Sequence, residues 1–495
     1  MIVAHGLRAA RRFARRIGVS GFAMLVGTSG CADGPRSVAA STATLRVGIG
    51  GLPQQTPQAG LRPLVGNLSI EGLINYNEDG RPRPWLAEGW TTSADGLLLT
   101  IQLREGARFH DGSPVSPAAV VAALQSTLPT AMGPAFEDVL TIQPSGDRHV
   151  NITLRAPSPF VLEALVSPIQ RPGGIGTGAY VAASTGAAEM TAFNGYYLGK
   201  PALETLSIRA YPTIRGAWAD LLRGNLDMLY EVGADALDSM QATTTVSVFS
   251  FVRRYQYLIV FGPRAHALDS ADVRRELNAA IDRTALVRDA FGTHGLPSSG
   301  PVPAQHWALS PTAPRLAFDV RTAKNLSSRH LRFTLLVPPD SLYERVALDA
   351  QRQLARVGVE MNLEEATQDR IVQAIRTGDF DAALGDIISG PSMFRLYQRW
   401  HTGGAFNPRS TNSKLIDAAL DRLRGARSDD EYRAGVTAFQ QAIVDDPPAL
   451  FLAWGERARA VSRRFDVPVP EGGRDVLATL RFWRPVAASQ LASRN

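Results

Sequence analysis

Cysteine and histidine are scarce in this chain. Cys31 is the only cysteine among 495 residues, so an internal disulfide is excluded. The eight histidines are scattered, with none of the spacings at which side chains ligate a structural zinc ion. Neither a Gly-x-Ser-x-Gly elbow nor the Gly-Lys-Ser/Thr ending of a phosphate loop occurs. The sequence therefore predicts no metal, no cofactor and no catalytic constellation.

Positive charge is concentrated at the amino terminus. Five arginines (Arg8, Arg11, Arg12, Arg15 and Arg16) lie in the first thirty residues, which contain no acid. Without these five arginines the formal net charge of +6 falls to +1. Basic residues elsewhere are interleaved with acids, as on an ordinary solvated surface. The high calculated pI therefore gives no support to a nucleic-acid-binding function.

Residues 1–30 have the pattern of an export signal. Arginines precede a short apolar stretch, and small residues lead to Cys31. A lone cysteine directly after such a signal favours a lipid-modified lipoprotein, although Thr28 stands where that pattern usually has leucine. The alternative is an incidental residue that is lost or left free after cleavage. Residues 31–44 are predicted to be a tether, and no later segment is long and apolar enough for a transmembrane helix.

The second half of the chain alternates strand and helix patterns. The predicted order is strand 332–337, a helix opened by the capping box Ser341-x-x-Glu344, strand 359–363, helix 367–376 and strand 380–385. The first of these helices carries a buried stripe of Val346, Ala350 and Leu354. Elements of these lengths in this order predict right-handed crossovers and a largely parallel sheet. Upstream, residues 272–283 are predicted to form a helix with Val273, Leu277 and Ile281 inward.

The first half carries an ordered series of turns, a strand and a capped helix. The series comprises 71–80 (Glu-Gly-Leu-Ile-Asn-Tyr-Asn-Glu-Asp-Gly), 83–90, the turn 93–96, the alternating strand 99–104, and 109–114 (Phe-His-Asp-Gly-Ser-Pro) before a helix capped by Ser116-Pro117. This series and the segment 272–283 resemble the oligopeptide/dipeptide-binding proteins that feed ABC importers, the extracytoplasmic solute-binding protein family 5. The resemblance extends from about residue 45 to about residue 460.

The resemblance implies a two-lobed α/β fold of the periplasmic-binding-protein type (class II, cluster C). Lobe I would comprise residues 45–257 and 470–495, with an extra mixed α/β subdomain at about 71–168, and lobe II would comprise 258–469. The two crossings between the lobes are expected near Tyr255–Val260 and between about Leu452 and Val469. Such a protein is expected to be a monomer.

Three residues are candidates for the solute site. In open α/β sheets ligands lie beyond the carboxyl ends of parallel strands, and Asp386 follows the predicted strand 380–385. Peptide-binding relatives carry in this loop an aspartate that pairs with the ligand's amino group, often just before a proline. Here Gly390 precedes Pro391, so Asp386 is displaced along the loop and could instead cap it. Tyr257 and Trp400 are the aromatic candidates, although Trp400 belongs to a stripe that could equally be core.

The function that the resemblance implies is capture without chemistry. The protein would bind a peptide or similar solute outside the cytoplasmic membrane by hinge closure and deliver it to an ABC permease and its ATPase. It is therefore expected in the periplasm or cell envelope, held at the membrane surface if Cys31 is lipidated. Two alternatives stay open: an exported hydrolase whose carboxylate pair is assembled by the fold, and a sensor or chaperone that needs no permease.

Overall fold

The computed structural model describes residues 43–50, 57–184, 188–292, 294–407, 412–470 and 475–486. The predicted export signal, Cys31 and nearly all of the predicted tether lie outside the described residues. Within the described ranges, every helix is too short or too polar to span a membrane.

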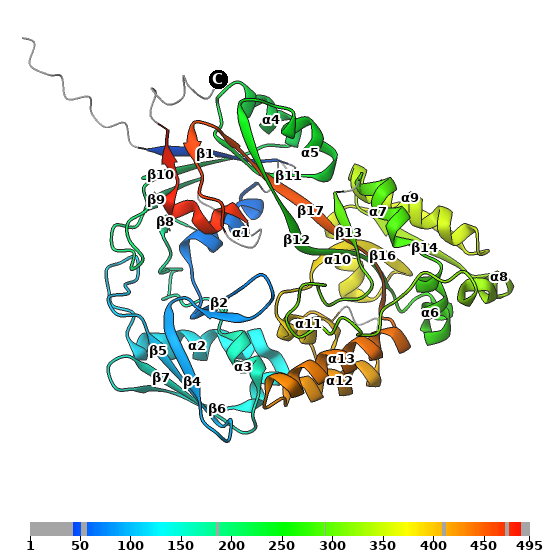
Figure 1. The fold of residues 1–495 in the computed structure, drawn as a ribbon, viewed down its shortest axis with the longest axis horizontal. Coiled ribbons are helices and arrows are strands. Elements are labelled where there is room, and N and C mark those ends of the chain that lie inside the picture. The colour runs from blue at the N-terminus through cyan, green and yellow to red at the C-terminus, as the bar shows by residue number, and fades with distance from the viewer. Residues whose placement is uncertain are drawn as a thin grey trace, which may run out of the picture. The chain divides into compact units, whose positions relative to one another are not determined.

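An eleven-stranded mixed sheet runs through the fold in the order β15-β14-β16-β12-β17-β11-β1-β10-β9-β8, with β13 attached to β17 (Figure 1). Parallel pairs occur on both sides of the antiparallel centre: β1 pairs with β10 and β11, and β14 pairs with β15 and β16. The sheet strands are β1 (Thr44–Ile49), β8 (Tyr180–Ala182), β9 (Glu189–Ala192), β10 (Thr205–Ala210), β11 (Met228–Val232), β12 (Val246–Phe261), β13 (Gly295–Pro297), β14 (Arg332–Val337), β15 (Glu360–Glu365), β16 (Ala382–Ile388) and β17 (Ala449–Ser462).

The long central strands β12 and β17 join the two α/β halves. Their antiparallel register shifts between Val252 and Gln256, opposite Glu456 and Trp454. Such an irregularity interrupts the ladder of hydrogen bonds and bends the strand locally. On one side of the shift β17 pairs with β11, and on the other side β12 pairs with β16. We call the half that contains β1 and β11 lobe I and the half that contains β14 and β16 lobe II.

Lobe I packs its helices and the carboxyl-terminal segment on the outer part of the sheet. Trp483 is fully buried in the same apolar cluster as Leu45 of β1. The described part of the carboxyl-terminal segment therefore helps to close the lobe I core. The remaining elements are α1 (Pro57–Ser69), α4 (Ile214–Leu222), α5 (Ala234–Gln241), β18 (Phe465–Asp466), the 3-10 helix η5 (Val476–Phe482) and β19 (Arg484–Pro485).

Lobe II carries helices on both faces of its strands. Helices α6, α7 and α9 share one apolar cluster with β14, and α10 to α13 belong to another. The predicted stripe of Val346, Ala350 and Leu354 is confirmed, since all three are fully buried. The elements are η2 (His266–Asp269), α6 (Ala271–Ala279), α7 (Arg283–Phe291), η3 (Thr322–Asn325), α8 (Leu326–Arg329), α9 (Ser341–Ala355), α10 (Gln368–Thr377), α11 (Met393–Trp400), α12 (Lys414–Arg424) and α13 (Asp429–Asp445).

The small subdomain has its own sheet, in the order β4-β5-β7-β6. The predicted alternation is confirmed: Leu99, Ile101 and Leu103 of β5 are buried. The predicted cap is also confirmed, because the Ser116 hydroxyl accepts from the N–H of Ala119. The elements are β2 (Ile74–Tyr76), β3 (Pro82–Pro84), β4 (Ala87–Thr92), β5 (Leu98–Leu103), α2 (Pro117–Met132), η1 (Gly133–Asp138), β6 (Val139–Ser145), β7 (His149–Leu154) and α3 (Pro159–Ala164).

Two predicted helices differ from the structure, because in each case an aspartate caps a helix start that the sequence pattern did not place there. Asp340, not Ser341, caps α9 and accepts from the N–H groups of Leu342 and Tyr343. The single helix predicted over 272–283 is two helices, because Asp282 accepts from the N–H groups of residues 284 and 285 and starts α7. In both cases the carboxylate satisfies helix-start donors that no residue within the helix can reach.

The strand before Asp386 is longer than predicted. The sequence pattern ends it at Gly385 and places Asp386 in a loop, whereas β16 continues to Ile388 and contains Asp386. The reason is the length of β12, which pairs with β16 as far as Tyr255 opposite Ile388. Asp386 is therefore a strand residue. The alternation of side chains along the strand determines the face of the sheet to which its carboxylate points.

Candidate functional site

Tyr257 and Asp386 lie side by side near the point where β12 passes from one lobe to the other. They are directly opposite in the register of β12 and β16, so both side chains project from the same face of the sheet. The Tyr257 side chain is almost fully buried, with 1% exposed, and its ring lies 5.5 Å from the ring of Tyr343 and 5.1 Å from that of Phe291. Glycine at 455 leaves room for this ring, since a Cβ there would lie 2.6 Å from Cε2 of Tyr257.

Charged groups from both lobes surround this tyrosine. Arg457 of β17 donates a hydrogen bond to the Tyr257 hydroxyl and pairs with Glu231 of β11 at 3.2 Å. Burial raises the pKa of Tyr343, and so does the nearby negative charge of Asp386. We call Glu231, Tyr257, Tyr343, Asp386 and Arg457 the hinge cluster.

The hinge cluster has the chemistry to hold a zwitterion. The Arg457 guanidinium can bind a carboxylate through two parallel hydrogen bonds. Glu231 from lobe I and Asp386 from lobe II can each accept from an ammonium group. Because the donors and acceptors come from both lobes, a solute bound here would touch both at once.

Trp400 does not join this cluster. It lies on α11, is 1% exposed, and packs edge-to-face on Phe451 with ring centroids 5.6 Å apart. Phe451 pairs with Leu258, the neighbour of Tyr257, and successive side chains of a strand point to opposite faces. Phe394 and Tyr397 of the same stripe are also buried, so in this conformation the stripe is core. A solute-binding role for Trp400 stays a prediction.

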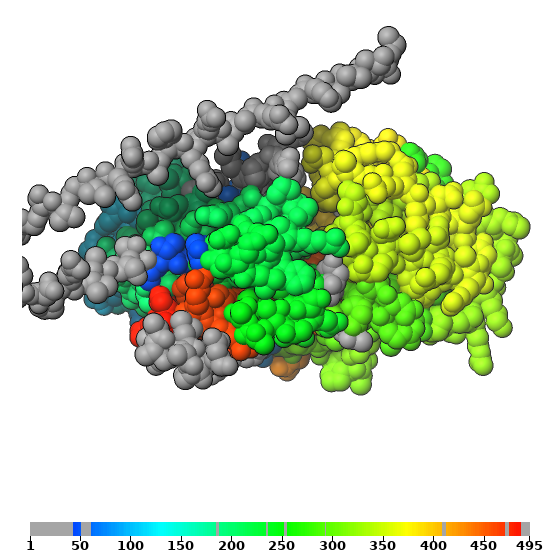
Figure 2. Space-filling model, turned by 90° about the horizontal axis from the view of Figure 1, so that it is seen from above, coloured from blue at the N-terminus to red at the C-terminus, as the bar shows by residue number. Residues whose placement is uncertain are grey.

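His294 forms a second connection between the lobes, and sequence patterns did not reveal it. Its Nε2 lies 3.0 Å from Oδ1 of Asp238 on α5, and its Nδ1 lies 3.1 Å from Oε2 of Glu456 on β17. A neutral imidazole carries one N–H, so only the protonated ring can donate to both carboxylates. Burial acts to lower the pKa of His294, but these two carboxylates outweigh it and the pKa is raised. Seen from above, the green segment with α4 and α5 lies beside the yellow surface of lobe II (Figure 2).

The remaining members of the hinge cluster were also missed by sequence reasoning, although signals for them exist. Glu456, Arg457 and Arg459 interrupt the mainly apolar β17, and a buried charge in a central strand needs a partner. Tyr343 lies in the first turn of α9, the helix that follows the carboxyl end of β14. Ligands of parallel sheets bind at this edge. The partner Glu231 has no comparable local signal.

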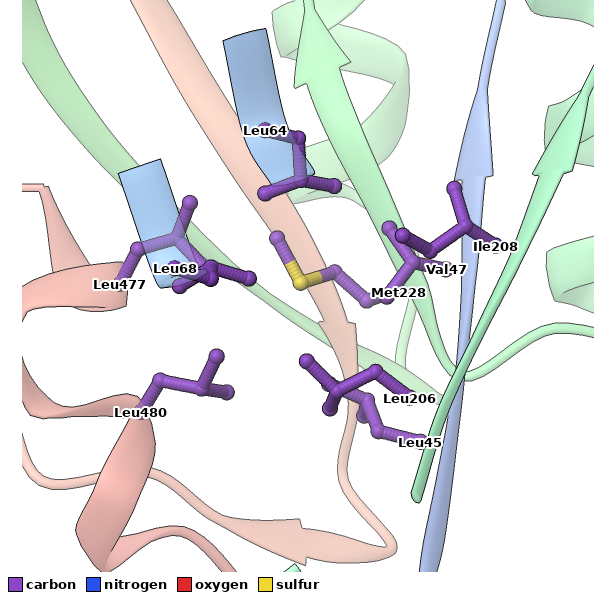
Figure 3. A pocket seen from close by; sticks show the side chains of 9 residues that line it. All are labelled: Leu45, Val47, Leu64, Leu68, Leu206, Ile208, Met228, Leu477 and Leu480. Atoms are coloured by element: carbon purple, nitrogen blue, oxygen red, sulfur yellow. The ribbon is translucent and has the colours of Figure 1, made fainter. Parts of the chain in front are cut away.

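An internal cavity in lobe I is too small to be the solute site. Its volume is about 10 Å³, room for at most one water molecule. The nine side chains around it are all apolar, so it has no group that could orient a solute (Figure 3). Its lining residues are Leu45, Val47, Leu64, Leu68, Leu206, Ile208, Met228, Leu477 and Leu480.

Two buried carboxylates outside the hinge cluster bear on the alternative of a hydrolase. Glu71 accepts from Trp85, Thr177, Tyr196 and Tyr197. Glu163 accepts from a different set of donors, on α11 and α13. Each carboxylate therefore lies in its own shell of donors, which differs from a shared acid/base pair. Among the described residues no cluster of three or more potential metal ligands occurs.

Comparisons with known sequences show which family the chain resembles. The profile of the bacterial extracellular solute-binding proteins, family 5, matches residues 81–407. A probable D,D-dipeptide-binding periplasmic protein of Escherichia coli (strain K12) is 25% identical over an alignment of 427 positions, which covers 78% of this chain and 82% of that protein. The glutathione-binding protein of the same strain is 26% identical over an alignment of 470 positions, which covers 88% of this chain and 86% of that protein.

Solved structures show the same fold at lower sequence identity. NikZ of Campylobacter jejuni in complex with Ni(L-His) has a TM-score of 0.76 at 21% identity, covering 90% of this chain and 99% of that one. The oligopeptide-binding protein AppA of Bacillus subtilis in complex with a nonapeptide has a TM-score of 0.73 at 18% identity, with the same coverage.

Proposed function

Since the chain belongs to the bacterial extracellular solute-binding proteins of family 5, the solute-binding components of ABC importers, we propose that it captures a small zwitterionic solute, such as a short peptide, by hinge closure. It then presents the closed complex to a membrane permease and its ATPase. Because the family consists of binding proteins, the proposal includes no catalytic step.

The observation that carries this proposal is that the residues of the hinge cluster come from both lobes. Glu231 belongs to lobe I, Tyr343 and Asp386 to lobe II, and Tyr257 and Arg457 to the two crossing strands. A solute that pairs its carboxylate with Arg457 and its ammonium group with Asp386 is held fully only when these elements come together. It therefore binds the closed form better than the open form and shifts the population toward closure.

The energy of such a capture is sufficient to move a hinge. A micromolar affinity corresponds to about −8 kcal/mol. Moving a two-state equilibrium from 1:99 to 99:1 requires a difference in affinity of about 5.5 kcal/mol between the two states. An open form favoured by a few kcal/mol is thus closed by a solute of ordinary affinity.

A melting experiment tests this function. Glutathione, the D,D-dipeptide D-Ala-D-Ala and Ni(L-His)₂ serve as probes, since relatives bind compounds of these kinds. A probe present at 100 times its Kd stabilises the folded protein by about 2.7 kcal/mol, and the melting temperature rises with its concentration. If no probe moves the melting temperature and native mass spectrometry finds no retained small molecule, the proposal is lost.

Substitutions then locate the site. Asp386→Asn and Arg457→Met are expected to weaken the binding of the active probe at least tenfold. Arg422→Met, an exposed arginine of α12, is the matched control and should leave binding unchanged. Binding that survives both of the first two substitutions would place the solute away from the hinge cluster.

We also propose a periplasmic location with a lipid anchor at Cys31, on a chain that acts as a monomer. The periplasmic location is supported by the relatives, which include a periplasmic protein of Escherichia coli. The anchor rests on the sequence pattern alone, because Cys31 lies outside the described residues. Mass spectrometry of the exported protein tests it: a diacylglycerol adduct is expected, and Cys31→Ser should release the protein from the membrane fraction.

A further inference from the structure

Glu163 of α3 is a carboxylate that the subdomain buries against lobe II. Its side chain is enclosed, with the residue 4% exposed. Oε2 accepts from the Ser392 hydroxyl at 2.7 Å and the Phe394 N–H at 2.9 Å, and Oε1 accepts from the Tyr432 hydroxyl at 2.5 Å. Ser392 and Phe394 form the start of α11, and Tyr432 lies on α13. All three donors therefore come from lobe II.

Apolar and charged contacts surround this carboxylate and belong to the same interface. Phe160, one turn before Glu163, packs on Phe394 and Tyr397 with ring centroids 5.7 and 5.3 Å apart. Arg424 of α12 pairs with Asp138 of the subdomain at 2.7 Å. Figure 1 shows the subdomain with α3 meeting α11, α12 and α13 at this point. The subdomain is thus closed onto lobe II in this conformation.

The subdomain is attached to lobe I in a different way. The contacts there are hydrogen bonds between backbone groups. The N–H of Gly178 donates to the carbonyl of Ser69 at 3.0 Å, and the N–H of His110 donates to the carbonyl of Gly176 at 2.9 Å. A Cβ at Gly176 would lie 2.0 Å from the Ser69 oxygen, so these segments touch directly. Since residues 69–72 and 165–178 also carry the chain between the two, the interface with lobe II is the one that can separate.

We propose that Glu163 is a positioning residue that couples closure of the subdomain onto lobe II, and with it solute capture, to the uptake of one proton from the solvent. The inference rests on the proposed function only in that closure accompanies capture. In the open form the carboxylate faces water and ionises in its ordinary range. When Glu163 takes up its proton in the closed form, its hydrogen bond with Tyr432 reverses direction: the proton on Oε1 is donated to the Tyr432 oxygen, while Oε2 still accepts from Ser392 and Phe394.

The direction of the effect follows from the environment of the closed form. Burial raises the pKa of Glu163, and its hydrogen bonds offset this only in part. The closed form therefore binds a proton at pH values where the open form has released it. Between the two pKa values the ratio of closed to open protein falls as pH rises, by up to tenfold per pH unit.

Other titratable groups near this interface do not produce the same signal. Burial raises the pKa of Tyr432, and burial lowers the pKa of His306 to about 4, so neither changes charge between pH 5 and 8. Other groups on the elements packed around Glu163 include the phenol of Tyr76, whose hydroxyl donates to the Glu163 carbonyl, and, in a second layer around Trp307, Asp79, Arg81, Asp429 and Arg433. Helix α11 adds Arg395, Tyr397 and Arg399, α13 adds Asp430 and Glu431, and Arg424 of α12 faces Glu137 and Asp138. His294 titrates at the hinge and needs a control of its own.

Spin-label distances in the full chain, without any solute, test this coupling. Cys31 is replaced by serine, and exposed Asp147 of the subdomain and Asp430 of lobe II are replaced by labelled cysteines. The ratio of the short-distance to the long-distance population is measured from pH 5 to pH 8. The same series is recorded with Glu163→Gln, which mimics the protonated carboxyl, with Glu163→Ala, with His294→Gln, and with Glu71→Gln as a buried glutamate at the other junction.

The expected result is a ratio that falls with rising pH in the parent protein, by several-fold to tenfold per pH unit within the window. Glu163→Gln should hold a high ratio at every pH, and Glu163→Ala a low one, because the lobe II donors then lack an acceptor. Glu71→Gln should keep the full slope, and His294→Gln should lose only the part of the slope that His294 contributes. A constant ratio in the parent, or the same slope in Glu163→Gln, overturns the coupling. The melting experiment with solutes would be untouched by that failure.

Discussion

The subdomain buries one glutamate, Glu71, at its junction with lobe I and another, Glu163, at its interface with lobe II. We expect only the interface with lobe II to open. Glu71 accepts from Tyr196 at 2.7 Å, Trp85 at 2.9 Å and Thr177 at 3.0 Å, beside backbone segments that are packed directly together. Glu163 accepts from lobe II across an interface made mainly of side chains. In our proposal the same chemistry fixes the subdomain permanently to lobe I and reversibly to lobe II. What differs is the covalent and backbone attachment behind each carboxylate.

The largest effect is expected from truncating Glu71. Glu71→Ala leaves the Trp85 N–H and three hydroxyls without their acceptor in a buried site, which costs about 3 kcal/mol of folding stability. Chemical denaturation of the solute-free protein measures this loss. Glu71→Gln, which keeps one acceptor, should lose less than half as much. An alanine variant as stable as the parent would show that the junction with lobe I does not depend on this residue.

The pH dependence of folding stability is a second test of the role of Glu71. Burial raises the pKa of Glu71 from 4.5 to about 7. The folded protein therefore holds a proton that the unfolded chain releases near 4.5, and folding stability falls as pH rises from 4.5 to 7, by about 3 kcal/mol at most. Denaturation midpoints measured across this range should decline in the parent and less steeply in Glu71→Gln. Parallel curves for the two proteins would contradict the assignment.

A substitution at Arg424 separates the strength of the lobe II interface from its proton coupling. Arg424 holds Asp138 at 2.7 Å and Glu137 at 2.8 Å, and its own side chain is 15% exposed. Arg424→Gln should therefore weaken closure by about 1–2 kcal/mol, a fivefold to thirtyfold drop in the closed-to-open ratio. The dependence of the ratio on pH should stay as in the parent. A lost slope would mean that charges other than Glu163 carry the coupling.

The smallest effect is expected at His294. Its bridge between Asp238 and Glu456 stabilises this conformation by about 1 kcal/mol. Because the pKa of His294 is raised above 6.5, this contribution is fully present below pH 6.5 and is lost as pH rises through the raised value. His294→Gln should lower the closed-to-open ratio at pH 6 and leave it unchanged at pH 9. An equal effect at both pH values would indicate a contact that does not depend on charge.

Local patterns predicted most of the fold because periodicity and caps are local. The stripe on α9, the alternation in β5 and the cap at Ser116 all depend on residues within a few positions of one another. The extent of β16 was not predictable in this way. It depends on β12, more than a hundred residues away, which pairs with β16 through Ile388 and turns Asp386 from a loop residue into a strand residue.

The candidate site shows the same division between local and distant information. Tyr257 and Asp386 were selected separately, and the register of two strands brought them together. Trp400 was selected for its ring and its position after Asp386, yet it packs on Phe451 at the other face. Arg457, Glu231 and Glu163 depend on partners that are distant in sequence, so only the assembled fold shows what each of them contacts.

Movement of the subdomain relative to lobe II on solute binding is the most direct test of the whole account. The label pair at positions 147 and 430 is measured at pH 7 while the probe that raises the melting temperature is titrated in. We expect the short-distance population to grow with probe concentration and to saturate together with binding. Saturated binding with an unchanged distance distribution would show that capture does not close this interface.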